Sequence, residues 1–203
     1  MFASTFLALA AVTAAVPTPK SLWFEFHDYP MKAFEKHWEG VTRFDLLVDP
    51  SGRVANCTVS KSSGHEDLDK TTCSLASFRA RFAPARGPAG EPAYGVYRSQ
   101  AIWVIPEHSL PNTTPGPDLQ VSVNTLPQGT QDPPAVQVAY MVDASGRISA
   151  CAGLKGSPAQ PAALIDVACH QIASRLPQRP AMTQDGQTVP VVRTAAVLFT
   201  AAH

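Results

Sequence analysis

The sequence lacks an excess of charge of either sign. Sixteen lysines and arginines balance sixteen aspartates and glutamates in a chain of 203 residues. Proteins that bind nucleic acid or an anionic membrane through their overall field carry a basic excess. Neither kind of partner is therefore expected.

The sequence also lacks the short motifs of common enzyme and metal sites. It contains no Gly-x-Ser-x-Gly, no His-Glu-x-x-His, no Gly-x-Gly-x-x-Gly and no phosphate-binding loop. Its six histidines and four cysteines show no metal-ligand spacing. We therefore expect no catalytic residue, no metal and no cofactor. A hydrolase whose site the sequence hides is an alternative that stays open.

No apolar run is long enough to span a bilayer, which takes about 20 residues. Residues 2–16 carry no charge, and small residues lie around Thr13 to Ala15, as in a secretory signal peptide with its cleavage site. No lysine or arginine precedes the run, so an uncleaved anchor or a start further upstream remains open. We predict a signal peptide over residues 1–16 and an exported protein, with membrane contact only if the segment is uncleaved.

Among the features that are present, the clearest is an internal repeat. The string Val-Asp-x-Ser-Gly-Arg occurs at 48–53 and again at 142–147, and each copy is followed by a cysteine four residues later. Further along, Cys73 matches Cys169 and Pro84-Ala85 matches Pro180-Ala181. Two copies indicate a tandem of small domains, since a solenoid needs more repeats. The predicted boundaries are 21–106 for module 1, 107–118 for a proline-rich linker and 119–203 for module 2.

Each module has the same predicted element order. Alternating apolar residues before the Asp-x-Ser-Gly turn indicate a strand, and the residues after the turn return as the second strand of a hairpin. Apolar residues at helical spacing follow in both copies, and Pro84 and Pro180 are predicted to end the two helices. A last strand follows at 96–105 and at 191–200. The fold class is therefore α+β, with a helix packed on one face of a small antiparallel sheet in each module.

The four cysteines, an even number, suit an oxidising compartment and allow three pairings; buried free thiols are the alternative. In each copy one cysteine lies on the returning strand and the other in the helix that packs on it. The repeat therefore favours the pairs Cys57–Cys73 and Cys151–Cys169. A bridge closing a loop of this size contributes about 3 kcal/mol in the chain-entropy model.

Module 1 resembles the C-terminal domain of TonB-type energy transducers. The matching residues are Tyr29-Pro30, 39–41, 48–54, 62–65, 68–69, 81–85, 90–92 and Trp103, and they cover about residues 28–105. Module 2 resembles the family only in its hairpin, its helix cysteine and its Pro-Ala pair, and looks like a diverged second copy of the cysteine-bearing form. The resemblance implies a periplasmic domain whose sheet edge pairs with an extended segment of an outer-membrane receptor or another envelope protein.

Strand addition of this kind gains affinity from main-chain hydrogen bonds and specificity from alternate side chains. We expect the last strand of module 1 to be the pairing edge. The predicted partner-binding residues are Val96, Tyr97, Ser99, Ala101 and Trp103. The predicted function is therefore a periplasmic, non-enzymatic protein-binding module connected with outer-membrane transport. A structural protein of the cell envelope with no transport role is a further alternative.

Overall fold

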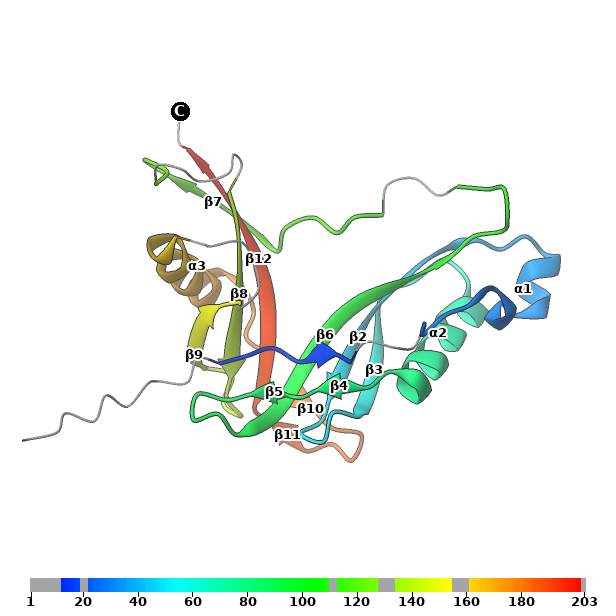
Figure 1. The fold of residues 1–203 in the computed structure, drawn as a ribbon, viewed down its shortest axis with the longest axis horizontal. Coiled ribbons are helices and arrows are strands. Elements are labelled where there is room, and N and C mark those ends of the chain that lie inside the picture. Colours follow the sequence, from blue (N-terminus) through cyan, green and yellow to red (C-terminus); the bar gives the residue numbers. More distant parts are fainter. Residues whose placement is uncertain (1–11, 19–21, 110–112, 128–133, 155–160, 202–203) are drawn as a thin grey trace, which may run out of the picture.

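The computed structural model describes residues 12–18, 22–109, 113–127, 134–154 and 161–201 (Figure 1). This part of the chain contains helices and strands in agreement with the predicted α+β class. None of its helices has the length and apolar character needed to cross a membrane.

The first half of the chain folds into a hairpin, a helix and a long strand. The hairpin strands are β2 (Gly40–Val48) and β3 (Val54–Lys61), the helix is α2 (Glu66–Arg79) and the long strand is β6 (Pro92–Trp103). β2 pairs antiparallel with both β3 and β6.

The second half has the same order of main elements. Its hairpin consists of β8 (Ala135–Val142) and β9 (Ile148–Gly153), followed by α3 (Ala162–Arg175) and β12 (Val191–Ala201). β8 pairs antiparallel with both β9 and β12. The helices α2 and α3 have the same length of 14 residues.

Shorter elements connect and flank these two units. They are β1 (Val16–Pro17), the 3-10 helix η1 (Phe26–Asp28), α1 (Met31–Glu35), β4 (Phe82–Ala83), β5 (Ala85–Arg86), β7 (Leu119–Val123), β10 (Ala181–Met182) and β11 (Thr188–Val189).

The hairpin turn of the first half is built on one aspartate. Asp49 Oδ1 accepts hydrogen bonds from the backbone N–H groups of Ser51 at 2.8 Å and Arg53 at 3.0 Å. Gly52 has φ +82°, and a Cβ there would lie 2.1 Å from the carbonyl oxygen of Phe82, so only glycine fits. The turn at 143–147 has the same aspartate bonds at the same distances.

The two halves join in one mixed sheet of eight strands, with the order β3-β2-β6-β12-β8-β9 and with β5 and β7 attached beside β6 and β12. The join is a short parallel pairing in which Val191 and Val192 of β12 lie beside Tyr94 and Gly95 of β6. The prediction of a separate small antiparallel sheet in each module is therefore wrong in this respect. In each half, the hairpin pairs with only one edge of the last strand. Over a short stretch, β6 and β12 pair with each other along their second edges.

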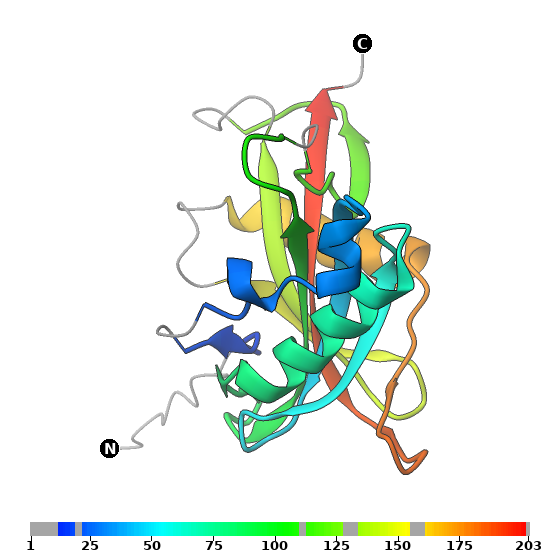
Figure 2. The ribbon, with the colours of Figure 1, turned by 90° about the vertical axis from the view of Figure 1, so that its right-hand side faces the viewer.

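The two long helices lie on opposite faces of this sheet (Figures 1 and 2). Phe44, Leu46 and Val48 of β2 belong to the core cluster under α2, whereas Leu47 belongs to the cluster under α3. Because side chains alternate between the two faces of a strand, one strand contributes to both cores.

Both helices end earlier than the prolines predicted. α2 ends at Arg79, because Ala80 takes an extended conformation and the chain enters β4 two residues later. α3 ends at Arg175, and Leu176 is extended directly before Pro177. A residue before proline disfavours the helical conformation, so Pro177 rather than Pro180 accounts for that end.

The segment 12–18, whose first residues belong to the predicted signal peptide, is part of the fold. Val12 and Ala15 are buried in the same core cluster as residues of both halves. Thr13 exchanges two backbone hydrogen bonds of 3.0 Å with Arg86, and β1 pairs antiparallel with β4. The earlier part of the predicted signal peptide, residues 1–11, lies outside the described residues.

Candidate partner-binding strand

β6 is paired along one edge and largely unpaired along the other. Its residues 95–103 pair with β2 without interruption. At the start of the strand, Pro92 and Ala93 pair with β5, and Tyr94 and Gly95 pair with β12. From Val96 onward, the described part of the chain contains no second strand beside β6. This edge is the one that the sequence predicts as the partner-binding strand.

The predicted side chains do not share one exposed face. Tyr97, Ala101 and Trp103 belong to the core cluster on the α2 face, where Ala101 and Trp103 are buried. Ser99 is half-buried. Val96 packs into the cluster on the other face. A partner strand would therefore meet the backbone of these residues rather than most of their side chains.

The side chains on the other face of the same stretch were missed by the sequence reasoning. These are Arg98, Gln100 and Ile102, which alternate with the predicted residues. Ile102 is 50% exposed. The alternation of side chains along β6 identifies two faces of the strand, but it does not show which face α2 covers.

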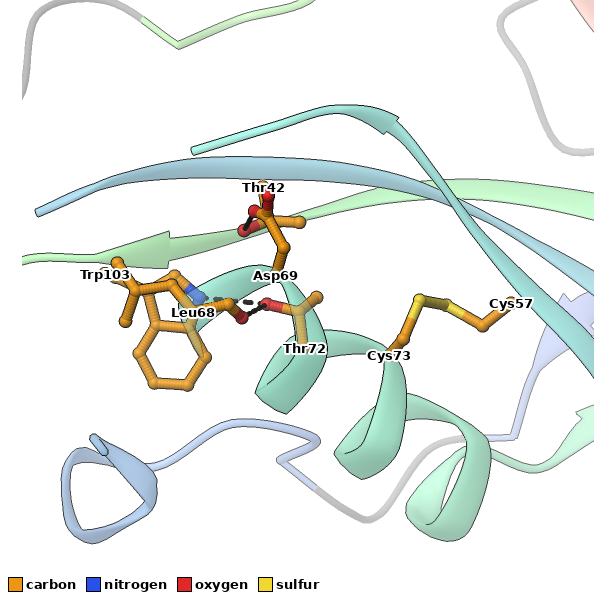
Figure 3. The surroundings of a disulfide bond; sticks show 7 residues. All are labelled: Thr42, Cys57, Leu68, Asp69, Thr72, Cys73 and Trp103. Atoms are coloured by element: carbon orange, nitrogen blue, oxygen red, sulfur yellow. Dashed lines mark hydrogen bonds between the residues drawn. A yellow bond between two sulfur atoms is a disulfide. The ribbon is translucent and has the colours of Figure 1, made fainter. Parts of the chain in front are cut away.

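Trp103 is held by a chain of buried hydrogen bonds that ends on α2 (Figure 3). Its indole Nε1 donates to Thr72 Oγ1 at 2.9 Å, and Thr72 Oγ1 donates to the carbonyl oxygen of Leu68 at 2.8 Å. The rings of Phe24 and Tyr29 lie edge-on to Trp103, with centroids 6.0 and 5.4 Å away. These contacts fix the far end of β6 against the helix.

A carboxylate on α2 holds the start of the helix to the sheet. Asp69 accepts hydrogen bonds from the hydroxyl groups of Thr42 at 2.8 Å, Ser62 at 2.5 Å and Ser63 at 2.8 Å. Burial alone would raise the pKa of Asp69, but these hydrogen bonds outweigh it and lower the pKa. Asp69 is thus satisfied by structural partners.

The end of α2 is fixed in a similar way. Arg79 donates two hydrogen bonds to the carboxylate of Asp28, at 2.5 and 2.7 Å. These bonds are the main reason that the pKa of Asp28 lies below its usual value. The pair ties η1 to the helix and so positions the aromatic residues that follow η1.

The exit of the chain from β6 is also held by a carboxylate. Glu39 accepts a hydrogen bond of 2.7 Å from the backbone N–H of Ile105, which lowers the pKa of Glu39, and its other close partner is His108 at 3.1 Å. The unpaired edge is therefore anchored at both ends, by β12 at its start and by Glu39 beyond its end.

The predicted cysteine pairs are both present as disulfides. Cys57 of β3 is bonded to Cys73 of α2, with a Cα–Cα distance of 5.6 Å (Figure 3). Cys151 of β9 is bonded to Cys169 of α3, with a Cα–Cα distance of 5.9 Å. In each half the bridge connects the hairpin's returning strand to the helix.

Residues 27–99 match the family model of the Gram-negative bacterial TonB protein C-terminal. The match begins within η1, ends within β6 at residue 99, and contains α1, β2, β3, α2, β4 and β5. The TonB C-terminal family is a periplasmic one, so this match supports a TonB-like role in protein interaction at the envelope. The comparisons with curated proteins and with solved structures find no match. In the residues that the structure describes, no group of three histidine, cysteine, aspartate or glutamate side chains is placed to hold a metal.

Proposed function

We propose that this chain is a periplasmic protein-binding module of the TonB C-terminal type and that β6 accepts an extended segment of an envelope protein as an added strand. The observation that carries the proposal is the edge of residues 96–103, which has β2 on one side and no described strand on the other. Such an edge presents a row of free N–H and C=O groups to an incoming chain.

Side-chain recognition in this proposal comes from the face away from α2. Arg98 is already paired with Asp118, and Gln100 Nε2 donates to Thr113 Oγ1 at 3.0 Å. Ile102 remains as a half-exposed apolar side chain beside the free edge. The partner segment is therefore expected to offer an apolar side chain opposite Ile102.

The second half is, in this proposal, a diverged copy of the first. The same element order, the equal helix lengths, the equivalent disulfides and the identical aspartate turns support it. The parallel pairing of β6 with β12 supports it as well. A two-fold rotation about an axis parallel to these strands would superpose one half on the other. The same rotation would place the two helices on opposite faces of the sheet, where they are found. The role of the second half is to extend the sheet and hold the start of β6.

A structural role in the envelope is the second candidate, and one observation favours it. β12 already occupies the start of the β6 edge, so part of the expected partner surface is used inside the molecule. In that case the sheet is complete as it stands, and no protein pairs with residues 96–103.

Photo-crosslinking in the native host separates the two candidates. A photoreactive phenylalanine analogue at Ile102 is expected to give a discrete protein adduct, whereas the same analogue at Met182, which is 62% exposed on β10, gives none. Equal adducts at both positions, or none at Ile102, would count against strand addition.

Proline substitution then tests whether the backbone makes the contact. Adjacent N–H groups of a strand point to opposite edges of that strand. Of the variants Ser99→Pro and Gln100→Pro, one therefore removes a hydrogen bond between β6 and β2. The other removes an N–H donor on the unpaired edge of β6. Thermal unfolding identifies the variant that removes only the unpaired donor, because it is the more stable of the two. That variant is expected to lose the adduct at Ile102, and an unchanged adduct contradicts the proposal.

A further inference from the structure

A cavity of about 260 Å³ lies where β6 and β12 diverge after their short parallel pairing. Val96 and Arg98 of β6 line one side, and residues 193–195 of β12 line the other. Tyr140 of β8 and the segment after α3, with Arg179, complete it. Its walls thus come from both halves of the chain.

One ion pair of the wall is fully satisfied. Arg98 binds both carboxylate oxygens of Asp118, one of them at 2.8 Å, and donates to the carbonyl oxygen of Thr194 at 3.0 Å. Asp118 also accepts from the backbone N–H of Ala196 at 2.8 Å. Burial would raise the pKa of Asp118, but the hydrogen bonds from Arg98 and Ala196 outweigh burial and lower the pKa. Asp118 therefore stays ionised and paired with Arg98.

Two other donors of the wall have no hydrogen-bond partner among the described residues. Arg193 Nε is buried and makes no hydrogen bond within the described part of the chain, while its Nη2 donates to the carbonyl oxygen of Arg179 at 3.0 Å. Tyr140 is only 6% exposed as a residue, and its hydroxyl makes no hydrogen bond to a described residue, but of the atoms in this wall only Arg193 Nε is itself both buried and unpaired. Buried donors are normally satisfied, so the unpaired Arg193 Nε calls for an explanation.

The protonation state of Tyr140 makes its hydroxyl a donor as well. Burial raises the pKa of this phenol, and the charges of Arg193 and Arg98 oppose the rise without cancelling it. Tyr140 and Arg193 are cross-strand neighbours on β8 and β12, and both line the cavity. A neutral phenol and a guanidinium N–H therefore face the same small space.

The charges of the lining leave a positive surplus. The charge of Asp118 neutralises that of Arg98. The remaining charged residues of the lining are two arginines, Arg179 and Arg193, and one carboxylate, Asp45. Asp45 is the cross-strand neighbour of Arg98, which draws it toward the satisfied pair. The unsatisfied side of the cavity is thus the basic one.

We propose that this cavity binds a carboxylate, which accepts hydrogen bonds from Arg193 Nε and the Tyr140 hydroxyl and faces Arg179 at the entrance. Guanidinium groups bind carboxylates strongly because their N–H donors match the geometry of the two oxygens. The volume is below the usual range for drug-sized ligands, which restricts the occupant to a small acid or to one acidic side chain. The assignment does not depend on strand addition at β6.

Acetate titration tests the site directly. In ¹H–¹⁵N spectra of the full chain, sodium acetate is expected to shift the Arg193 Nε–H signal in a saturable way, whereas acetamide, and sodium chloride at the same ionic strength, are not. Arg193→Gln should weaken binding about tenfold or more and Tyr140→Phe severalfold, because each removes a donor. Arg147→Gln, at an exposed residue of the same half, is the matched control and should leave the affinity unchanged.

The same titration contains the result that overturns the proposal. An equal response to chloride, or unchanged acetate affinity in Arg193→Gln, excludes a carboxylate site. If Arg193→Gln loses its dispersed amide spectrum, Arg179→Gln and Tyr140→Phe decide the matter, and wild-type affinity in both again excludes it.

A pair of peptides distinguishes the two sources of the carboxylate. A seven-residue peptide with a central glutamate is compared with its glutamine counterpart. Binding of the glutamate peptide at least tenfold tighter than acetate, and lost with glutamine, assigns the site to an acidic side chain of a partner. Acetate binding without this gain assigns it to a small free acid. Equal binding of both peptides, with no acetate response, overturns the proposal.

Discussion

At the scale of single residues, the hydroxyl of Thr72 connects two elements that the sequence leaves unrelated. It accepts from the indole of Trp103 and donates to the carbonyl oxygen of Leu68, both in the buried core. The helical pattern predicts that position 72 faces the sheet, but no sequence signal shows that a polar group there meets a tryptophan 31 residues away. Such pairings depend on the register of β6 against α2.

Thr72→Val is expected to lower the free energy of unfolding by about 1–3 kcal/mol, because valine keeps the shape but leaves the buried indole N–H without an acceptor. Urea titration followed by tryptophan fluorescence measures the loss. Thr71→Val is the matched control, since Thr71 makes no side-chain hydrogen bond within the described residues. Equal losses in both variants would show that the hydrogen bond contributes nothing specific.

The carboxylate of Asp28 predicts a pH dependence of stability. Its bonds with Arg79 hold its folded pKa below that of the unfolded chain, which is about 3.9. The contribution is therefore complete above that value and is lost as the pH falls through the folded pKa. Asp28→Asn should remove part of the acid slope of the unfolding free energy below about pH 4.

The control for this experiment is Asp166→Asn. Asp166 is exposed on α3 and makes no ion pair within the described residues. Its replacement should leave the acid slope as it is in the unchanged protein. The same slope in Asp28→Asn would show that the pair with Arg79 is not linked to stability.

At the scale of elements, the hairpins and the disulfide pairs were predictable because their signals are local. The aspartate and glycine of each turn determine its shape within four residues, and the cysteines recur with the turns. The face of β6 was not predictable, since it depends on where α2 crosses the sheet. The helix ends were misplaced because Ala80 and Leu176 leave the helix before the prolines are reached.

The bridges between strand and helix give a prediction at this scale. Replacing Cys57 and Cys73 together by serine should lower the free energy of unfolding by about 3 kcal/mol, since the loop between them then closes without a covalent constraint. The equivalent double variant of Cys151 and Cys169 should lose a similar amount. Chemical denaturation measures both, and non-reducing peptide mapping checks the pairs, where a peptide linking Cys57 to Cys151 would contradict the structure.

At the scale of the whole molecule, the joining of the halves was the feature that the sequence did not predict. Among the described residues, the parallel pairing of β6 with β12 consists of Tyr94 and Gly95 beside Val191 and Val192. Nothing in the identity of these residues distinguishes a partner strand within the chain from one in another protein. Asp118, at the end of the predicted linker 107–118, adds the ion pair with Arg98 across the join. Contacts of this kind depend on how the two folded halves pack against each other, and local sequence patterns do not determine that packing.

The N-terminal segment offers a test of the molecule as a whole. Deleting residues 1–15 is expected to lower the free energy of unfolding by about 2–3 kcal/mol, because Val12 and Ala15 leave the core. Deleting residues 1–11 keeps these side chains and is the matched control. Thermal and urea unfolding of both proteins gives the comparison.

The N-terminus of the protein isolated from its native host completes this test. A mature chain that begins at or before Val12 retains the contacts with Arg86 and β4, in contrast to the predicted cleavage after residue 16. A chain that begins later, together with no loss of stability in the longer deletion, would show that the segment contributes nothing to the mature protein. Mass spectrometry of the intact protein distinguishes these outcomes.

The two disulfides have a consequence for how the protein meets other molecules. In the described sheet, β3 and β9 are the outermost strands, and each has one neighbouring strand instead of two. These are the strands that carry Cys57 and Cys151, so each is fastened to a helix by a covalent bond. A fastened edge strand cannot peel away to exchange with another copy, which is a common start of domain swapping and aggregation. The bridges thus protect both outer edges of the described sheet from exchange with another chain.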